Sequence, residues 1–387
     1  MLDHYFKTLN SDLKTQGIAT PQLIVDDAAL QQNLQYIQTK LVQAEQLKPR
    51  LVVKSLASLD LLQLLSEKLN TQRFMVFHLP HIQLILENFT AADLLLGKPM
   101  PAQAARTFYA QNSAWTKANI QWLIDTKQRL LQYLEIAKDY AITLHVNIEI
   151  DVGLHRGGVQ SETQFAEILS VIQQYPRYLK LSGLMGYDAH VTKIPSIIKK
   201  PDQAYQESQQ IYLNYQKVIQ TQFPALWNSD LCFNGGGSPT FTFHISKSVC
   251  NDLSFGSMLL KPSDFESDSL KSLQPALWIA TPVLKVLPFA QLPAMSLLNK
   301  LPHKSKALFI YGGYWLADYV YPHQCRPHLL YGRSSNQELV NIPKDCDIQV
   351  DDFVFLRPTQ SEAILPQFSE LKLYQQHAFE TWQTFRE

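Results

Sequence analysis

The stretch Lys48-Pro49-Arg50-Leu51-Val52-Val53-Lys54-Ser55-Leu56 decides the fold. A short apolar, β-branched run ends here in Lys54, and residues 59–65 follow with apolar side chains at helical spacing. Strand, short turn and helix in this order predict one βα unit with an amine where the strand stops. In a β/α barrel, side chains at the carboxyl ends of the strands face the active-site mouth. Lys54 is therefore either a surface lysine that ends a strand or an amine able to form a Schiff base with a carbonyl.

The same alternation continues through the first two thirds of the chain. Further apolar runs lie at residues 22–26, 74–77, 93–97, 120–125, 145–150, 181–186 and 231–234, and most of them precede a stretch at helical spacing. Short continuous apolar strands are typical of a parallel sheet buried on both faces. Eight such units predict an α/β fold with an N-terminal (β/α)8 TIM-like barrel, and an open doubly wound sheet is the alternative.

The pattern changes after about residue 265. Stretches that look like strands, separated by Pro, Asn and Ser, lie at residues 278–286, 307–311, 318–321, 328–331, 349–356 and 370–373. We therefore predict a barrel domain over residues 18–262 and a C-terminal β-rich domain over residues 263–387. Residues 2–16 read as a short amphipathic helix, and we expect residues 1–17 to pack on the second domain.

Composition excludes several classes of protein. The chain has 387 residues, 46% hydrophobic and 18% charged, with a formal net charge of zero. This balance describes a globular protein and gives no sign of a nucleic-acid or membrane partner. The four cysteines are widely spaced, and the start of the chain lacks the basic and apolar segments of a signal peptide. We expect a cytoplasmic protein with reduced thiols.

The glycine-rich stretch Phe233-Asn234-Gly235-Gly236-Gly237-Ser238-Pro239-Thr240 follows a late strand of the predicted barrel. Consecutive glycines expose backbone N–H groups, and two hydroxyls follow them. Loops after the seventh and eighth strands of a barrel often hold a phosphate. The stretch predicts a phosphate site around Gly236, Gly237 and Ser238, and a flexible surface turn is the alternative.

Two further strand ends carry polar side chains. Arg156 stands among glycines after residues 148–151, where it can meet an anionic oxygen or form an ion pair with Glu149 or Asp151. Tyr187 and His190 follow the next strand and offer a phenol and an imidazole. The alternative for His190 is a histidine in the core whose ring nitrogens are hydrogen-bonded within the protein.

These stretches, taken in order, resemble the pyridoxal-phosphate (PLP) enzymes of the alanine racemase fold, also called fold-type III. The similarity is greatest to the D-threonine aldolase and D-serine dehydratase branch, and it rests on the motifs at Thr20-Pro21, Pro49–Lys54, Asp151–Val159, Gly183–His190, Gly235–Phe241 and Phe255–Ser257. The resemblance implies a PLP-holding barrel, a C-terminal β domain and a homodimer with sites near the interface.

The resemblance also implies roles for particular residues. Lys54 matches the Schiff-base lysine, and Arg156 matches the arginine near the cofactor ring. Tyr187 and His190 match pocket residues, while Gly236, Gly237 and Ser238 match the phosphate cup. Asp264 falls where the family often has an acidic residue.

The chain departs from that family near its C-terminus. The aldolase and dehydratase bind a metal there through a His and, two residues on, an Asp or Cys, whereas Gln360 and Glu362 occupy this spacing here. A glutamine replaces imidazole poorly, so two polar residues on a strand edge are the alternative to a metal site. Tyr314, in a Gly-Gly-Tyr turn, is either the second base that racemases of this fold use or a buried aromatic.

Three hypotheses follow for the function. The first is a PLP-dependent lyase acting on a D-3-hydroxy amino acid, with Lys54 holding the cofactor and His190 acting on the 3-hydroxyl. The second is an amino-acid racemase with Lys54 and Tyr314 on opposite faces of the cofactor. The third is a PLP-binding protein without turnover. Within the first hypothesis, the sequence does not decide between an aldolase and a dehydratase.

Overall fold

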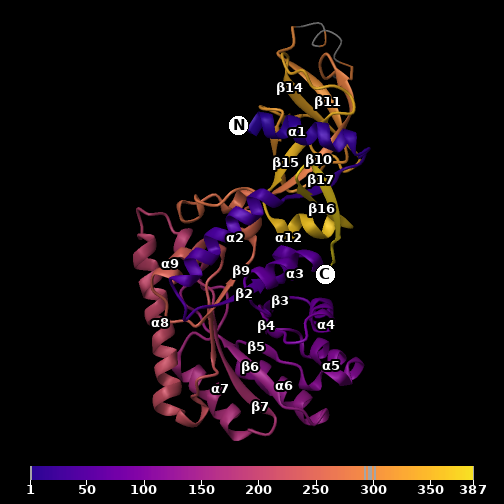
Figure 1. Cartoon of the computed structure of the whole chain (residues 1–387). Coiled ribbons are helices and arrows are strands. Elements are labelled where there is room, and N and C mark those ends of the chain that lie inside the picture. Colours follow the sequence, from indigo (N-terminus) through magenta and orange to yellow (C-terminus); the bar gives the residue numbers. More distant parts are fainter. Residues whose placement is uncertain (1, 292, 295–298, 300–301, 387) are drawn as a thin grey trace.

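The computed structural model describes residues 2–291, 293–294, 299 and 302–386 (Figure 1). A closed barrel forms the lower part of the molecule in this view, and a β-rich part stands above it. The predicted fold class is therefore confirmed. None of the helices within the described ranges has the length and apolar character needed to cross a membrane.

The barrel consists of eight parallel strands. They are β2 (Lys48–Val52), β3 (Arg73–Val76), β4 (Asp93–Leu96), β5 (Ile120–Ile124), β6 (Leu144–Glu149), β7 (Leu179–Gly186), β8 (Cys232–Gly235) and β9 (Asp252–Phe255). Each strand pairs with its neighbours in chain order, and β9 closes the ring by pairing with β2. Most residues of these strands are apolar and buried, as expected for a sheet whose outer face is covered by helices.

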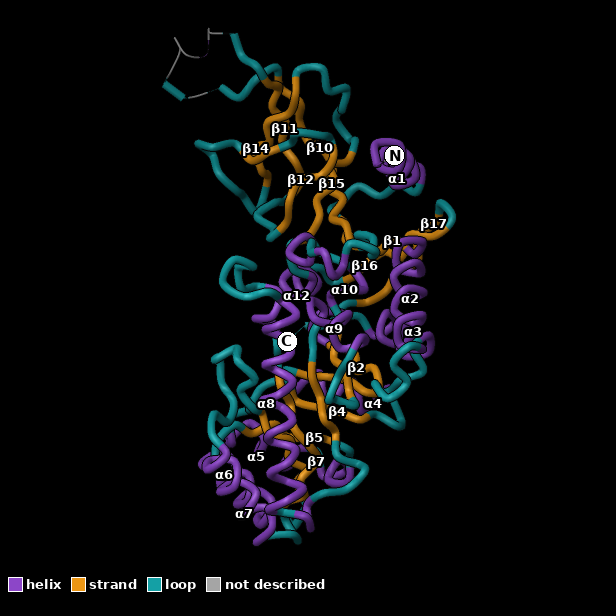
Figure 2. The backbone as a smooth tube through the Cα atoms, turned by 90° about the vertical axis from the view of Figure 1, so that its left-hand side faces the viewer, coloured by secondary structure: helices purple, strands orange, loops and turns teal. Residues whose placement is uncertain are grey.

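Helices follow most of the barrel strands, and the longer ones cover the outside of the ring (Figures 1 and 2). They are α2 (Asp27–Val42), α3 (Leu59–Lys68), α4 (Leu79–Asn88), α5 (Ala102–Gln111), α6 (Lys127–Asp139), α7 (Glu162–Gln174), α8 (Pro201–Gln222), α9 (Phe241–Ser246) and α10 (Ser257–Leu260). Side-chain oxygens of Asp26, Thr126 and Ser161 cap α2, α6 and α7 by accepting from backbone N–H groups.

One strand expected in the barrel lies elsewhere. Strand β1 (Gln22–Asp26) pairs antiparallel with β10 and parallel with β16, both in the second sheet. The eighth barrel position belongs instead to β9, which sequence analysis did not identify. A fully buried apolar strand such as β1 can pair equally well in either sheet, so its sequence does not decide between them. Strand β9 was missed because the polar residues Asp252 and Ser254 interrupt its apolar pattern.

The second part of the molecule contains a nine-stranded sheet. Besides β1, its strands are β10 (Leu277–Leu287), β11 (Ser305–Tyr311), β12 (Ala317–Tyr321), β13 (Arg326–Pro327), β14 (Gln337–Pro343), β15 (Phe353–Pro358), β16 (Glu370–Gln375) and β17 (Ala378–Gln383). The strand expected at residues 328–331 is wrong, because this segment forms a turn beyond β13. Strands β14 and β17 were missed.

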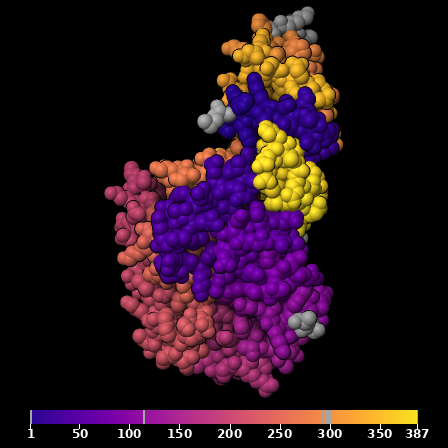
Figure 3. Space-filling model, viewed as in Figure 1, coloured from indigo at the N-terminus to yellow at the C-terminus, as the bar shows by residue number. Residues whose placement is uncertain are grey.

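The N-terminal helix α1 (Leu2–Thr15) packs on this second sheet, at the top in Figure 3. Its apolar face, formed by Phe6, Leu9 and Leu13, is buried in one cluster with residues of the sheet. The ring of Phe6 stacks on that of Phe355 with centroids 4.8 Å apart. The first and last segments of the chain therefore both complete the β-rich part.

Candidate active site

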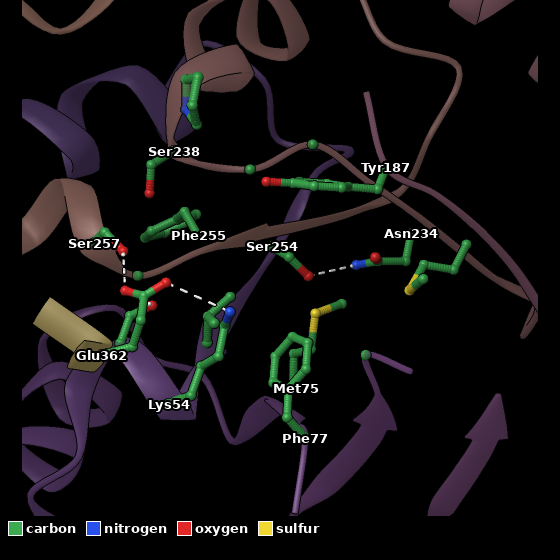
Figure 4. Close-up of a pocket in the computed structure, with 18 of the residues that line it drawn as sticks. Lys54, Met75, Phe77, Tyr187, Asn234, Ser238, Ser254, Phe255, Ser257 and Glu362 are labelled. Carbon is green, nitrogen blue, oxygen red and sulfur yellow. Dashed lines mark hydrogen bonds and ion pairs between the residues drawn. The ribbon is translucent and has the colours of Figure 1, made fainter. Parts of the chain in front are cut away.

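A cavity opens where the barrel strands end (Figure 4). Most of its lining comes from residues that end barrel strands or follow them directly, in agreement with the usual location of active sites in such barrels. Glu362 comes from α12 (Ser361–Ile364) and so brings the second part of the molecule into the lining. The cavity is therefore formed jointly by the barrel and the β-rich part.

Lys54 lies directly after β2, in the one-turn helix Val53–Leu56, and its side chain enters this cavity. Its Nζ atom lies 3.5 Å from the Oε1 atom of Glu362 and 4.7 Å from the centre of the Phe77 ring. A carboxylate and an aromatic face both stabilise an ammonium group. These two contacts hold the amine at the cavity wall, where a bound carbonyl compound can meet it.

The glycine-rich loop forms another wall of the cavity. Gly236 has φ of +76°, and a Cβ atom there would collide with the Cδ1 atom of Leu253. The loop therefore needs glycine at this position for conformational and steric reasons. Ser238 begins a short 3-10 helix, and the hydroxyl of Ser238 accepts a hydrogen bond from the N–H of Met258 at 3.0 Å.

Two glycine-bearing turns meet at this wall. Gly256 and Ser257 follow β9 and line the cavity beside Gly237 and Ser238. The first N–H groups of a helix have no acceptor within that helix, so those of Ser238 and Ser257 are available to an anion. Hydroxyls and N–H donors brought together in this way fit a phosphate group.

Arg156 and Tyr187 line the cavity from the ends of neighbouring strands. The guanidinium carbon of Arg156 lies 4.9 Å from the centre of the Tyr187 ring, a cation–π contact. Burial raises the pKa of Tyr187, with Asp188 and Glu362 adding to this effect and Arg156 opposing it. Tyr187 is therefore a neutral phenol at pH 7, and Arg156 is a cation that can meet an anionic ring oxygen.

Sequence analysis missed a buried pair beneath the glycine loop. The Oδ2 atom of Asp188 lies 2.8 Å from Nε2 of His244, and the hydroxyl of Thr240 donates to Oδ1 at 2.7 Å. Burial by itself raises the pKa of Asp188, but His244 and the hydrogen bonds lower it by more, so the net pKa is depressed. Since Thr240 belongs to the loop and Asp188 follows Tyr187, the pair ties the loop to the end of β7. Asp188 and His244 lie close in sequence to the predicted motifs, but no sequence pattern predicts that these two side chains meet.

We predict that Asp188→Ala destabilises the fold by about 3 kcal/mol at pH 7, as removal of one partner of a buried pair typically does. A carboxylate with a depressed folded-state pKa stabilises the fold fully above its unfolded pKa of about 4, and this contribution is lost as pH falls through the folded pKa. Urea midpoints at pH 7 and pH 3.5 should therefore differ less in Asp188→Ala than in the unmodified chain. Asp230→Ala, at an exposed site, is the control, and equal pH dependence of the unmodified chain and Asp188→Ala would contradict the assignment.

A buried polar network forms the floor of the cavity. Asn234 donates to Ser254 at 2.8 Å, as Figure 4 shows, and to Asp252 at 2.6 Å. Asp252 also accepts from the fully buried Arg50 at 2.7 Å. Arg50 neutralises Asp252, and this pairing explains how a charge is tolerated inside the barrel. Asn234 and Ser254 are lining residues that sequence analysis did not identify.

His190 lies outside this lining. Its Nε2 atom is 3.2 Å from the Ser208 hydroxyl on α8, and burial lowers the pKa of His190. The reason is the one-turn helix Ala189–Thr192 after β7, which turns His190 towards α8 while Tyr187 faces the cavity. The structure does not bring His190 together with Lys54.

Tyr314 also lies outside the lining of its own chain's cavity. Its side chain is 68% exposed, so the expectation of a buried aromatic is wrong. The backbone of Tyr314 has φ of +57°, and its N–H donates to Glu338 at 2.9 Å. A non-glycine residue in this conformation is held there by its surroundings.

Gln360 and Glu362 do not converge on one point. The amide of Gln360 donates to Asp264 at 2.8 Å, whereas Glu362 faces Lys54. Residues two apart share one face of a strand but not of a helix, and α12 begins at Ser361 between them. Among the residues that the structure describes, no group of three His, Cys, Asp or Glu side chains could hold a metal. These donors do not fit a metal site.

The cavity does fit PLP. It combines an amine at Lys54, a cation at Arg156, and glycine turns with hydroxyls and N–H donors for a phosphate. The Gly236 conformation leaves no room for a side chain at this turn, so the backbone itself forms the wall.

Comparisons with known proteins agree with this assignment of the fold. The family model described as "Alanine racemase, N-terminal domain" matches residues 25–264. A comparison with curated proteins finds no match.

Solved structures share the fold over nearly the whole chain. D-threonine aldolase from Filomicrobium marinum has a TM-score of 0.74 at 13% identity, covering 94% of this chain and 96% of that one. D-threo-3-hydroxyaspartate dehydratase from Delftia sp. HT23 has a TM-score of 0.73 at 13% identity, covering 96% and 98%. Alanine racemase from Bacillus anthracis has a TM-score of 0.69 at 12% identity, covering 94% and 98%. The chain belongs to the alanine racemase family of fold-type III PLP enzymes.

Proposed function

We propose that this protein is a PLP-dependent lyase that acts on a D-3-hydroxy amino acid, as an aldolase or an ammonia-lyase. One observation supports it most: Lys54 and the glycine loop, far apart in the sequence, line a single cavity at the carboxyl ends of the barrel strands. The names of two structurally similar enzymes, a D-threonine aldolase and a D-threo-3-hydroxyaspartate dehydratase, support the substrate class.

Six of the lining residues have a task in this proposal. Gly236, Gly237 and Ser238 hold the phosphate, and Arg156 meets the anionic side of the ring. Bound PLP supplies a pyridinium ring that accepts electrons from the substrate. The Nζ atom of Lys54 anchors the cofactor and, once free, carries protons at one face of the substrate. The half-buried ring of Tyr187 shields this region from water in the proposal.

The position of Tyr314 limits how a racemase could work. Racemisation needs one proton removed from a face of the substrate carbon and another returned on the opposite face, so it needs two bases. Tyr314 is exposed and does not line the cavity of its own chain. It could serve as the second base only from another copy, and we propose a homodimer on the resemblance to the family.

The reaction is tested by incubating the PLP-loaded protein with D-threonine, D-serine and D-alanine in turn. Glycine with acetaldehyde identifies the aldolase, and a 2-keto acid with ammonia identifies the dehydratase. Appearance of the L-enantiomer identifies the racemase. Bound PLP without any of these products supports the non-catalytic alternative and contradicts the lyase.

We predict that the activity needs no divalent metal. The amide and the carboxylate that occupy the metal spacing face different neighbours, so they cannot hold an ion together. Dialysis against EDTA, followed by addition of Mn²⁺ or Zn²⁺, should change the turnover less than about threefold. Loss of activity on chelation and recovery with one metal would contradict this prediction.

We predict that Tyr314→Phe retains most of the lyase turnover, within about threefold, because the reaction needs no base on the second face. The measurement is product formation from D-threonine or D-serine. A loss of 10²-fold or more in this turnover, in the range of general-base removal, would contradict the prediction. Solvent deuterium entry into both enantiomers of alanine, lost in Tyr314→Phe, would instead support the racemase.

A further inference from the structure

Glu362 is the one acidic side chain in the cavity lining of the described chain, and it faces Lys54 (Figure 4). The other charged side chains in the lining are Lys54 and Arg156, both cations. Only Glu362 can therefore accept hydrogen bonds there as an anion, and its side chain remains 26% exposed.

The hydrogen bonds of this carboxylate are weak. Its Oε2 atom accepts from the hydroxyls of Ser55, Ser257 and Ser361 at 3.3, 3.4 and 3.4 Å. Hydroxyl donors usually approach a carboxylate to about 2.5–2.7 Å. Its Oε1 atom lies 3.5 Å from the Nζ atom of Lys54. When that amine is bonded to the cofactor, it no longer serves as an ammonium partner for Glu362. Glu362 therefore has acceptor capacity to spare, facing the cavity.

The position of Lys54 brings the substrate within reach of this carboxylate. The substrate amine must approach the same cofactor atom that Lys54 Nζ approaches, and Glu362 lies 3.5 Å from Nζ. A hydroxyl on carbon 3 is three bonds away from that amine. The surrounding walls at Met75, Phe77 and Phe265 carry no competing acceptor.

We propose that Glu362 determines the substrate class, by accepting a hydrogen bond from the 3-hydroxyl and by rejecting substrates with a second carboxylate. This inference rests on the proposed function and replaces metal binding by a direct contact. Like charges brought together in a partly buried cavity repel each other strongly. The chain should therefore differ from the D-threo-3-hydroxyaspartate dehydratase that shares its fold, because the substrate in that enzyme's name carries a second carboxylate.

The test measures binding rather than turnover. The PLP-loaded protein is mixed in a stopped-flow instrument with D-serine, D-alanine or D-aspartate, and the first change in cofactor absorbance gives a dissociation constant. We expect D-serine to bind at least 10-fold more tightly than D-alanine, and D-aspartate at least 10-fold more weakly than D-alanine. In Glu362→Gln the preference for D-serine should fall at least threefold, and D-aspartate should bind at least 10-fold more tightly than before.

Two further variants make the result specific. Glu362→Asp keeps the charge and should still reject D-aspartate. Glu380→Gln, an exposed site on β17, should behave as the unmodified protein. Equal ratios in the unmodified protein and Glu362→Gln would overturn the role of Glu362 and leave the proposed lyase standing. If no D-amino acid changed the absorbance of any of these proteins while borohydride still fixed PLP on Lys54, both the proposed function and this inference would be overturned.

Discussion

Lys54→Ala is expected to lower turnover by at least about 10³-fold, because one change removes both the covalent anchor and the proton carrier. The altered protein should still bind PLP through the glycine turns, but without a covalent bond. Reduction with borohydride should fix the cofactor on the unmodified protein only, and the labelled peptide should contain Lys54. Turnover and mass spectrometry of the digested protein are the two measurements.

Two variants separate this role from a general effect of charge. Lys54→Arg keeps a cation beside Glu362 but has no amine that can bond to the cofactor, so it should be as inactive as Lys54→Ala. Lys68→Ala, at the exposed end of α3, should be fully active. A label on any other lysine, or substantial activity of Lys54→Arg, would show that Lys54 is not the anchor.

Gly236→Val should produce the second largest effect, a loss of PLP affinity by about 10- to 100-fold. At φ of +76° a β-branched residue is strained by about 1–3 kcal/mol. Its Cβ would also collide with Leu253 and lie 3.0 Å from the His244 ring, so the loop must move. Since about 1.4 kcal/mol corresponds to tenfold in affinity, displacement of the loop accounts for this range. Fluorescence titration with PLP measures it.

The matched control is Gly17→Val. Gly17 has a similar φ of +68°, but a Cβ there meets nothing within 4 Å and the residue lies far from the cavity. This variant should lose stability through backbone strain and keep its PLP affinity. Gly236→Ala should give an intermediate loss. If Gly236→Val bound PLP as tightly as the unmodified protein, the phosphate would lie elsewhere.

Part of this site could be predicted because it depends on short local patterns. An apolar run that ends in Lys54 before a helical stretch indicates a strand end, and strand ends in a barrel face one mouth. The glycines of residues 235–237 stand out in a chain with only 14 glycines. Lys54, Arg156, Tyr187, Gly236, Gly237 and Ser238 all line one cavity for this reason.

The rest depended on which segments meet in space. Strand β1 could bury its two apolar faces in either sheet. Its pairing with β10 and β16 in the folded chain places it in the second sheet. The direction of the His190 side chain could not be read from strand alternation or helical spacing, because a single helical turn directs it towards Ser208.

Glu362 shows most clearly the difference between what local sequence predicts and what packing decides. Its spacing from Gln360 suggested a shared strand face, but the start of α12 between them separates the two side chains by the rotation of a helix. Its distance to Lys54 spans 308 positions of the sequence and depends on how the β-rich part packs on the barrel. The sequence by itself determined the fold and the residues at strand ends, since periodicity is local. Only the tertiary structure decided that a carboxylate faces the lysine, since that contact is a product of packing.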